Sequence, residues 1–318
     1  MIPSGFRGYA NLTRYEHTIR TPVTCSGIGL HSGAKVNMQI LPARAGSGIV
    51  FRRVDLDGFC VEAVSRNVAK VSYATSLMKQ GVLISTTEHL LSAFIGVGVD
   101  NAVVELDSLE VPLLDGSAEP FARMLRDSGL KPQRRKREYL RILRPLQVCD
   151  GDKFIGVYPG DGYSVTYAID FPHPLIGQSS FQVELSGDEY IREIAPARTF
   201  GFLADERQLR NMGLIRGVSP QNCVVLTQDG IANPPLRFPD EFVRHKVVDL
   251  IGDLALLGHR ILGRVVANRA GHAMHTALVS KILKDRTAWE PAVLAETGVP
   301  AAQPVLAGSG LFGKHDHG

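Results

Sequence analysis

The chain divides into two halves that end in the same succession of elements, and this repetition limits the folds that it can adopt. Each half closes with an amphipathic helix, a strand and a second helix. These elements are expected at about 86–97, 101–106 and 117–128 in the first half, and at about 240–258, 261–268 and 271–284 in the second. Mainly strand-like sequence precedes each group, as in Ala34–Ile40 and Tyr163–Ile169, where apolar and polar residues alternate. The pattern predicts an α+β fold of two similar domains, each a β-sheet layered with α-helices, and the cleft between them is the expected place for an active site.

A basic stretch, Lys131–Glu138, separates the two halves. It has no apolar periodicity and contains a proline, so we interpret it as an interdomain linker, with a nucleic-acid-binding patch as the alternative. The predicted domains are therefore an N-terminal domain over residues 13–130 and a C-terminal domain over residues 138–285. Residues 286–318 are rich in alanine, glycine and proline, and we expect them to form a flexible tail.

Composition argues against several classes of protein. The 318 residues are 44% hydrophobic and 21% charged, which is typical of a globular protein, and a net charge of +3 is too small for a broad nucleic-acid-binding field. The first 17 residues lack the apolar core of a secretory signal, and no apolar run approaches the roughly 20 residues of a membrane helix. The four cysteines are far apart without a CxxC pair, which favours reduced, buried thiols. We therefore expect a cytoplasmic protein that binds no nucleic acid, and we expect a monomer.

The helix expected at 240–258 carries chemically active residues on one side. At about 100° per residue, its apolar side chains share one face. The opposite face gathers an imidazole, an ammonium and two carboxylates, from His245, Lys246, Asp249 and Asp253. A histidine and an aspartate four residues apart are close enough to bind one metal ion. The alternative is a solvated face on which His245 and Asp249 form a hydrogen bond.

A Glu-His pair stands at the start of the helix expected at 86–97. Ser85-Thr-Thr-Glu88 matches the capping-box pattern, in which Glu88 would have a structural role. A carboxylate beside a metal-binding histidine also suits hydrolysis, because it can take a proton from water on the metal. These residues alone do not decide whether Glu88 caps the helix or acts as a general base. Together with His245 and Asp249, His89 would complete an open three-ligand set for a catalytic zinc ion.

Six short motifs occur in the order and spacing of one enzyme family. They are Gly27–His31, Ser85–Leu90, Leu113–Ala118, Ala197–Phe202, Phe242–Asp253 and Ala270–Ala273. In these motifs the chain closely resembles the UDP-3-O-acyl-N-acetylglucosamine deacetylases, the zinc enzymes of the committed step of lipid A biosynthesis. The similarity extends from about Thr13 to Leu283. It implies zinc-dependent hydrolysis of the N-acetyl group of UDP-3-O-acyl-N-acetylglucosamine.

The resemblance also implies catalytic roles for individual residues. It implies that one Zn²⁺, with Fe²⁺ as the alternative ion in the cell, is held by His89, His245 and Asp249. Glu88 is implied to be the general base, and His272 a cationic general acid or oxyanion partner. Asp253 resembles the carboxylate that pairs with this histidine, and Thr199 resembles the hydroxyl that donates to the oxyanion.

The resemblance extends to the substrate contacts. Five residues are implied to bind substrate, namely Lys246 and Phe200 at the sugar, and Lys153, Phe171 and Arg269 at the UDP group. Arg269 stands where a lysine is expected, which keeps the charge but changes the geometry. Residues 202–227 resemble an insert that forms an apolar passage for the acyl chain, although an ordinary packed helix and hairpin is the alternative. Two other functions stay open, the same zinc fold acting on another acylated amide and a non-catalytic UDP-sugar-binding protein.

Overall fold

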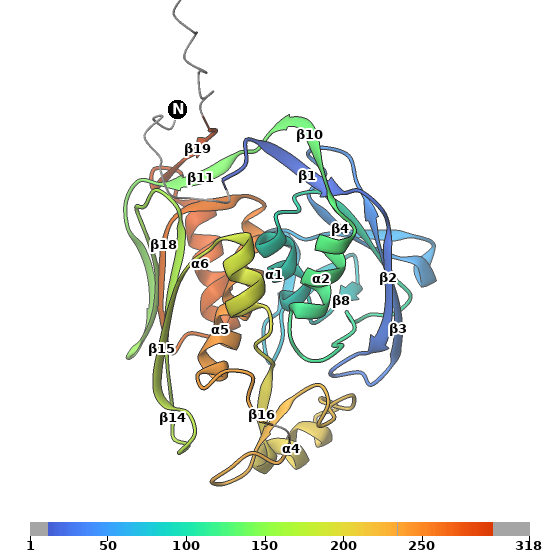
Figure 1. Cartoon of the computed structure of the whole chain (residues 1–318), viewed down its shortest axis with the longest axis vertical. Coiled ribbons are helices and arrows are strands. Elements are labelled where there is room, and N and C mark those ends of the chain that lie inside the picture. The colour runs from blue at the N-terminus through green and yellow to red at the C-terminus, as the bar shows by residue number, and fades with distance from the viewer. Residues whose placement is uncertain (1–11, 234, 295–318) are drawn as a thin grey trace, which may run out of the picture.

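Two β-sheets enclose a central layer of helices in the computed structural model, which describes residues 12–233 and 235–294 (Figure 1). The first sheet has five strands, in the order β2 (Val23–Ile28), β3 (Lys35–Pro42), β9 (Ala102–Leu106), β4 (Ile49–Arg53) and β5 (Phe59–Glu62). Strand β9 is antiparallel to β3 and parallel to β4. Its residues alternate between buried and half-buried, as expected for a strand with one face on the core.

The second sheet has seven strands and is built around β18 (Arg260–Asn268). Its main path runs β12 (Leu146–Asp150), β13 (Lys153–Tyr158), β18, β11 (Tyr139–Ile142) and β19 (Trp289–Ala292), and β14 (Tyr163–Phe171) pairs with both β18 and β15 (Gly177–Glu184). Strand β18 is parallel to β11 and β14 and antiparallel to β13. The smaller sheets are β1 (Tyr15–Ile19) with β10 (Leu130–Lys136), β6 (Val68–Lys70) with β7 (Ser76–Lys79) and β8 (Val82–Ile84), and β16 (Phe200–Phe202) with β17 (Val224–Leu226).

Four helices fill the space between the two large sheets. They are α1 (Glu88–Val97), α2 (Glu119–Asp127), α5 (Glu241–Leu254) and α6 (His272–Lys284). The single turn α3 (Gly187–Glu189) leads into the π-helical turn Tyr190–Ile194, which packs against α1, α2 and α5, whereas α4 (Glu206–Asn211) lies outside this layer. Helix α5 packs against α1, α6 and β14, and α6 packs against β12 and β13. In Figure 1, α2 lies on the side of α1 that faces the five-stranded sheet. Because α1 and α5 pack against each other, residues from the two halves of the chain meet at the centre of the molecule.

The α+β class is confirmed, and so are the helices and strands expected at the end of each half. The structure has α1, β9 and α2 in the first half and α5, β18 and α6 in the second, each within a few residues of its expected bounds. The four cysteines are free thiols, as expected, but only Cys223 is buried. Cys25 is half-buried and Cys60 and Cys149 are exposed, so the expectation of buried side chains is wrong for these three. Within the described residues, no helix has the length and apolar character required to cross a membrane.

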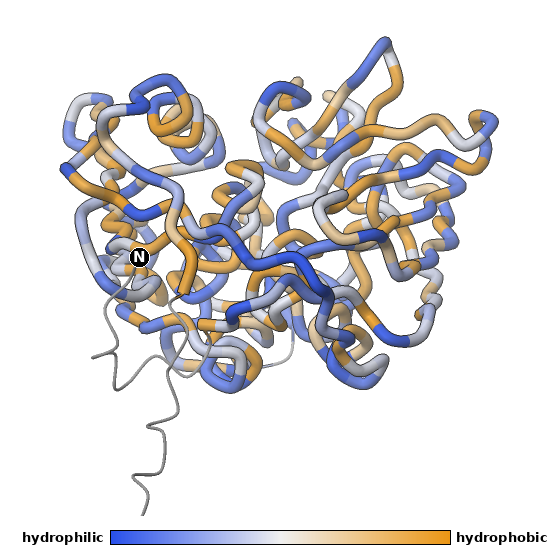
Figure 2. Tube along the Cα trace, turned by 90° about the horizontal axis from the view of Figure 1, so that it is seen from above, coloured by the Kyte–Doolittle hydropathy of each residue, from blue (hydrophilic) through white to orange (hydrophobic). Residues whose placement is uncertain are grey.

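The basic stretch expected as a linker is a β-strand. Most of Lys131–Glu138 lies in β10, which pairs antiparallel with β1 and leads into β11 of the seven-stranded sheet. Figure 2, which views the molecule from above, shows a hydrophilic segment across the middle of the view, and β10 lies along the top of the molecule in Figure 1. A two-stranded ribbon buries little side-chain surface, so it needs no apolar alternation, and this is why the sequence pattern did not reveal it. The segment joins the halves while its backbone is hydrogen-bonded.

The tail expected to be flexible from residue 286 contains one more strand. Trp289–Ala292 form β19, which pairs antiparallel with β11. The indole Nε1 of Trp289 donates a hydrogen bond to the carbonyl of Ile282, at 2.7 Å. The expectation of a flexible tail is therefore wrong for these residues, and its remainder, residues 295–318, lies outside the described residues.

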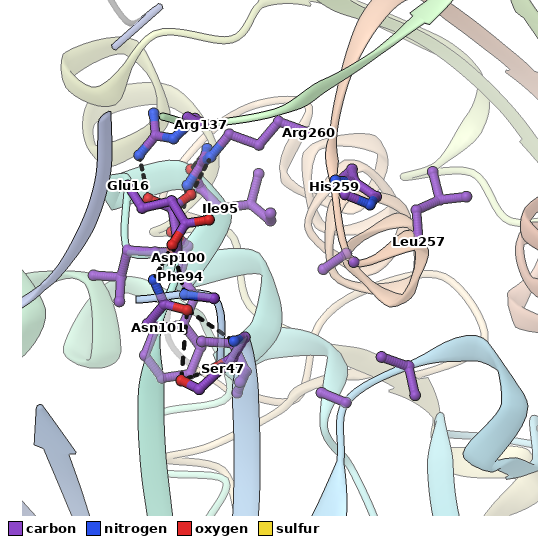
Figure 3. Close-up of a pocket in the computed structure, with 18 of the residues that line it drawn as sticks. Glu16, Ser47, Phe94, Ile95, Asp100, Asn101, Arg137, Leu257, His259 and Arg260 are labelled. Carbon is purple, nitrogen blue, oxygen red and sulfur yellow. Dashed lines mark hydrogen bonds and ion pairs between the residues drawn. The ribbon is translucent and has the colours of Figure 1, made fainter. Parts of the chain in front are cut away.

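Charged side chains join the halves at the C-terminal end of α1, beside a pocket of about 370 Å³ (Figure 3). Arg137, which follows β10, and Arg260 of β18 both bind the carboxylate of Asp100, with nitrogen–oxygen distances of 2.5 and 3.3 Å. Arg260 also donates to the carbonyl of Ile95, at 2.6 Å. Cationic groups at helix carbonyls offset the negative end of the helix dipole. This end of α1 is therefore structural, and the chemically active residues lie at its other end.

Candidate active site

Three predicted metal ligands converge where α1 and α5 pack together. The Nε2 atoms of His89 and His245 lie 3.5 and 3.4 Å from Oδ1 of Asp249. All three ligand atoms lie within 4.8 Å of one another. Tetrahedral zinc with bonds of about 2.0–2.2 Å places neighbouring ligand atoms about 3.3–3.5 Å apart. The arrangement fits one zinc ion with a fourth position left for another ligand.

Neighbouring groups hold these ligands in the form that binds a metal. Nδ1 of His245 lies 3.0 Å from the carbonyl oxygen of Ala197, which directs Nε2 toward the other ligands. Burial lowers the pKa of His245 to about 4, so its imidazole is neutral. Lys246 Nζ donates to Oδ2 of Asp249 at 2.6 Å. Although burial acts in the opposite direction, this ammonium helps to hold the pKa of Asp249 well below its usual value.

The polar side of α5 is buried, which rules out the alternative of a solvated face. His245, Asp249 and Asp253 are 3%, 4% and 0% exposed. Helix α5 has α1 on one side and β14 on another, so both its apolar and its polar residues lie in the interior. A buried charge is costly unless it is paired or bound to a metal, so this concentration of ionisable groups indicates a functional site.

Gly252 allows α1 and α5 to approach closely at this point. An ideal Cβ atom on Gly252 would lie 2.0 Å from the carbonyl oxygen of Glu88. Any side chain would therefore push the start of α1 away from α5. Because Gly252 is one turn from Asp249, this contact sets the separation between His89 and its two partner ligands.

Glu88 does not cap its helix. Helix α1 begins at Glu88, and no side-chain hydrogen bond is made at the N-cap residue, Thr87. The backbone N–H of Ser85 donates instead to the carbonyl of Leu109, at 2.8 Å. The Glu88 carboxylate accepts a hydrogen bond from the backbone N–H of Thr75, at 3.1 Å. The capping-box interpretation is wrong, and burial raises the pKa of Glu88, which suits a proton acceptor.

A second cluster of ionisable groups adjoins the metal ligands. Oδ2 of Asp253 lies 2.7 Å from Nδ1 of His272 and 2.8 Å from Nδ1 of His275. Nε2 of His272 lies 4.0 Å from Oδ2 of Asp249. Although burial alone would lower it, the Asp253 carboxylate raises the pKa of His272 to about 9. His272 is therefore a cation at neutral pH, beside the candidate metal site.

Sequence reasoning assigned no role to Thr75 and His275, which complete this cluster. The hydroxyl of Thr75 donates to Oδ1 of Asp253, at 2.5 Å. His275 lies nearly one turn after His272 on α6, and that spacing was the available signal for it. Thr75 precedes a short strand in a loop, and nothing in the surrounding sequence marks it.

The residues expected to touch the sugar lie beside the metal ligands. The ring of Phe200 in β16 stands edge-on to that of His245, with centroids 6.3 Å apart, and 5.7 Å from that of Phe171. Thr199 and Phe200 open into a pocket of about 390 Å³. Most of its further lining is apolar and comes from the segment 202–227 and nearby loops, for example Leu30, Leu203, Leu209, Ile215 and Val218.

Two residues expected to bind UDP lie at the edge of the seven-stranded sheet. Lys153 begins β13, and Arg269 follows its neighbour β18. Arg269 is half-buried and forms an ion pair with Asp152. In the described part of the chain, no hydrogen bond or ion pair joins Lys153 or Arg269 to the metal ligands. Phe171, by contrast, is brought to the site through its contact with Phe200.

Comparison with known proteins agrees with this geometry. A family model described as UDP-3-O-acyl N-acetylglycosamine deacetylase matches residues 16–284. The chain is 53% identical over 278 residues to the UDP-3-O-acyl-N-acetylglucosamine deacetylase of Solibacter usitatus, covering 87% of this chain and 94% of the relative. The proteins of the same name from an Anaeromyxobacter species and from Methylococcus capsulatus are 44% and 43% identical, and the matches cover 92% and 89% of this chain and 97% and 94% of the relatives. The chain belongs to the UDP-3-O-acyl N-acetylglycosamine deacetylase family.

Proposed function

We propose that this protein hydrolyses the N-acetyl group of UDP-3-O-acyl-N-acetylglucosamine. The products are acetate and UDP-3-O-acyl-glucosamine, and the reaction is the committed step of lipid A biosynthesis. The observation that carries the proposal is the buried cluster of His89, His245 and Asp249, with Glu88 beside His89 and His272 beside Asp249. A metal site, a base and a cationic acid are the groups that amide hydrolysis requires.

The ligand set favours Zn²⁺ as the single catalytic ion. Two imidazoles and one carboxylate at these distances would hold one zinc ion and leave a position for another ligand. When bound, zinc would lower the pKa of its water to about 7 and polarise the amide carbonyl. Fe²⁺ accepts the same nitrogen and oxygen ligands and is the competing ion.

The protein residues move the protons of the reaction. Glu88 takes a proton from the water that attacks the acetyl carbonyl carbon. Thr199 and the protonated His272 donate hydrogen bonds to the oxygen on which negative charge develops. As the C–N bond breaks, His272 gives its proton to the leaving amine, and acetate departs. Asp253, bound to Nδ1 of His272, stabilises the cation and leaves Nε2 free for the substrate.

The surrounding residues supply the substrate site. We assign Lys246 and Phe200 to the sugar, and Lys153, Phe171 and Arg269 to the UDP group. The diphosphate would replace Asp152 as the partner of Arg269, because both present anionic oxygens to the guanidinium. The pocket of about 390 Å³ beside Thr199 has apolar walls that suit the 3-O-acyl chain.

The same proposal covers the organisation of the chain. Residues 13–130 and 138–285 would form two α+β domains, the second completed by strand β19 (Trp289–Ala292), with the active site in the cleft between them. Its support is that His89 comes from α1 in the first half, whereas His245 and Asp249 come from α5 in the second. We also propose that the protein acts as a cytoplasmic monomer, because its substrate is a nucleotide-linked sugar and the ligand set is complete within one chain.

The decisive experiment is deacetylation by the purified protein. Acetate release from UDP-3-O-acyl-N-acetylglucosamine should stop after thorough chelation and return when zinc is added. Activity that survives complete metal removal would overturn the proposal. Simpler N-acetylated amides should release acetate far more slowly, and equal rates would show that the enzyme acts on another class of amide.

A further inference from the structure

Thr75 contacts both halves of the proposed proton-transfer machinery. It lies between β6 and β7 and is 0% exposed. Its backbone N–H donates to Oε2 of Glu88 at 3.1 Å, and its hydroxyl donates to Oδ1 of Asp253 at 2.5 Å. The hydroxyl oxygen also lies 3.3 Å from Nδ1 of His272. We infer that Thr75 is a positioning residue that orients the Asp253 carboxylate, and through it the imidazole of His272.

The hydrogen bonds of Asp253 explain why one hydroxyl matters. Oδ2 accepts from two imidazoles, those of His272 and His275, while Oδ1 accepts from Thr75. Asp253 is 0% exposed, so bulk water does not reach Oδ1. A buried carboxylate oxygen without a donor is unfavourable. If the hydroxyl is removed, the carboxylate is expected to rotate until one imidazole binds Oδ1, and the ring of His272 shifts with it.

The two contacts of Thr75 can be separated by substitution. Its bond to Glu88 comes from the backbone. Its carbonyl accepts from the N–H and the hydroxyl of Thr87, at 3.2 and 3.1 Å, which ties the loop to the start of α1. Replacing the side chain therefore removes the donor to Asp253 while the backbone contact with Glu88 stays in place.

The inference rests on the roles proposed for Glu88 and Asp253, and Thr75→Val tests it in the full-length zinc-loaded enzyme. Valine keeps the shape and loses the hydroxyl. We expect kcat to fall on the order of 10- to 100-fold while KM changes little, because Thr75 orients the acid without touching substrate. Thr75→Ser keeps the donor and should retain most of kcat. If valine is not tolerated, Thr75→Ala against Thr75→Ser makes the same comparison, since both lack the methyl group.

Thr18→Val is the matched control. Thr18 is 3% exposed, and its hydroxyl accepts from the backbone N–H of Ala43 at 3.0 Å, away from the site. This variant also loses a buried hydroxyl, but it should keep wild-type kcat. Thermal unfolding and zinc content are measured for every variant. Wild-type kcat in Thr75→Val, equal losses in Thr75→Val and Thr75→Ser, or an equal loss in Thr18→Val would each overturn the inference.

Two further variants separate this inference from the proposed function. If Glu88→Ala and Asp253→Ala both keep wild-type turnover, the proposed mechanism is wrong, and the inference falls with it. If both lose turnover while Thr75→Val keeps it, only the role of Thr75 is wrong. A loss in all three, with rescue by Thr75→Ser, supports both.

Discussion

Gly252→Ala is a direct test of how the two central helices build the proposed metal site. The new Cβ would lie 2.0 Å from the Glu88 carbonyl oxygen, whereas ordinary contacts begin at 3.4 Å. The obstacle is the backbone of α1, so α1 and α5 must separate by about 1 Å or more. The 3.5 Å distance between His89 Nε2 and Asp249 Oδ1 would then approach about 4.5 Å, beyond the span of about 3.3–3.5 Å in tetrahedral zinc sites.

The expected result is a loss of zinc affinity as well as stability. Overpacking of this kind costs about 1–3 kcal/mol of the free energy of unfolding. Zinc affinity should fall on the order of 10- to 100-fold, the loss typical when the support of a metal ligand is disturbed. Competition with a chromophoric chelator measures the zinc affinity, and chemical unfolding of the metal-free protein measures the stability.

Gly96→Ala separates the two effects. Gly96 is also on α1, and a Cβ there would lie 2.1 Å from the ring of Tyr190, near the end of the helix opposite to His89. We expect this control to destabilise the fold to a similar degree while zinc affinity stays normal. Wild-type zinc affinity in Gly252→Ala would refute the argument that this contact sets the ligand geometry. An equal loss of affinity in Gly96→Ala would refute it too, because general destabilisation would then suffice.

Three further predictions concern the base, the histidine and the acyl pocket. Glu88→Gln should keep zinc and lower kcat by on the order of 10²- to 10⁴-fold in acetate release, and near-normal turnover would remove Glu88 as the base. In the metal-free protein, the raised pKa of His272, about 9 against 6.5 unfolded, contributes stability that is fully present below pH 6.5 and is lost as pH rises through 9. Chemical unfolding should therefore show a decrease of up to about 3 kcal/mol over this range, and Asp253→Asn should flatten it; an unchanged slope would contradict the pairing. Leu209→Ser, in the wall of the apolar pocket, should raise KM for long acyl chains more than for short ones, and an equal effect on both would place the chain elsewhere.

Local sequence patterns were enough to predict the main helices and to pair two of the three candidate metal ligands. Apolar periodicity predicted α1, α5 and α6, because a helix repeats its buried face along the chain and needs no distant partner for that pattern to appear. The spacing of His245 and Asp249 placed them on one face of α5 for the same reason. The third candidate ligand, His89, was proposed from the Glu-His pair at a helix start and supported by the family motifs, but no local pattern links residue 89 to residue 245.

The roles of the ambiguous residues depend on contacts that form only when the chain folds. Glu88 matched a helix cap equally well, and the burial of its carboxylate against the backbone of Thr75 excluded that role. Thr75 and Asp253 are 178 positions apart, so no local pattern could join them. Such contacts depend on how closely α1 and α5 pack, and a single glycine at 252 controls that distance. The residue types along the chain indicate the chemistry of the candidate site, but the packing of the helices sets its geometry.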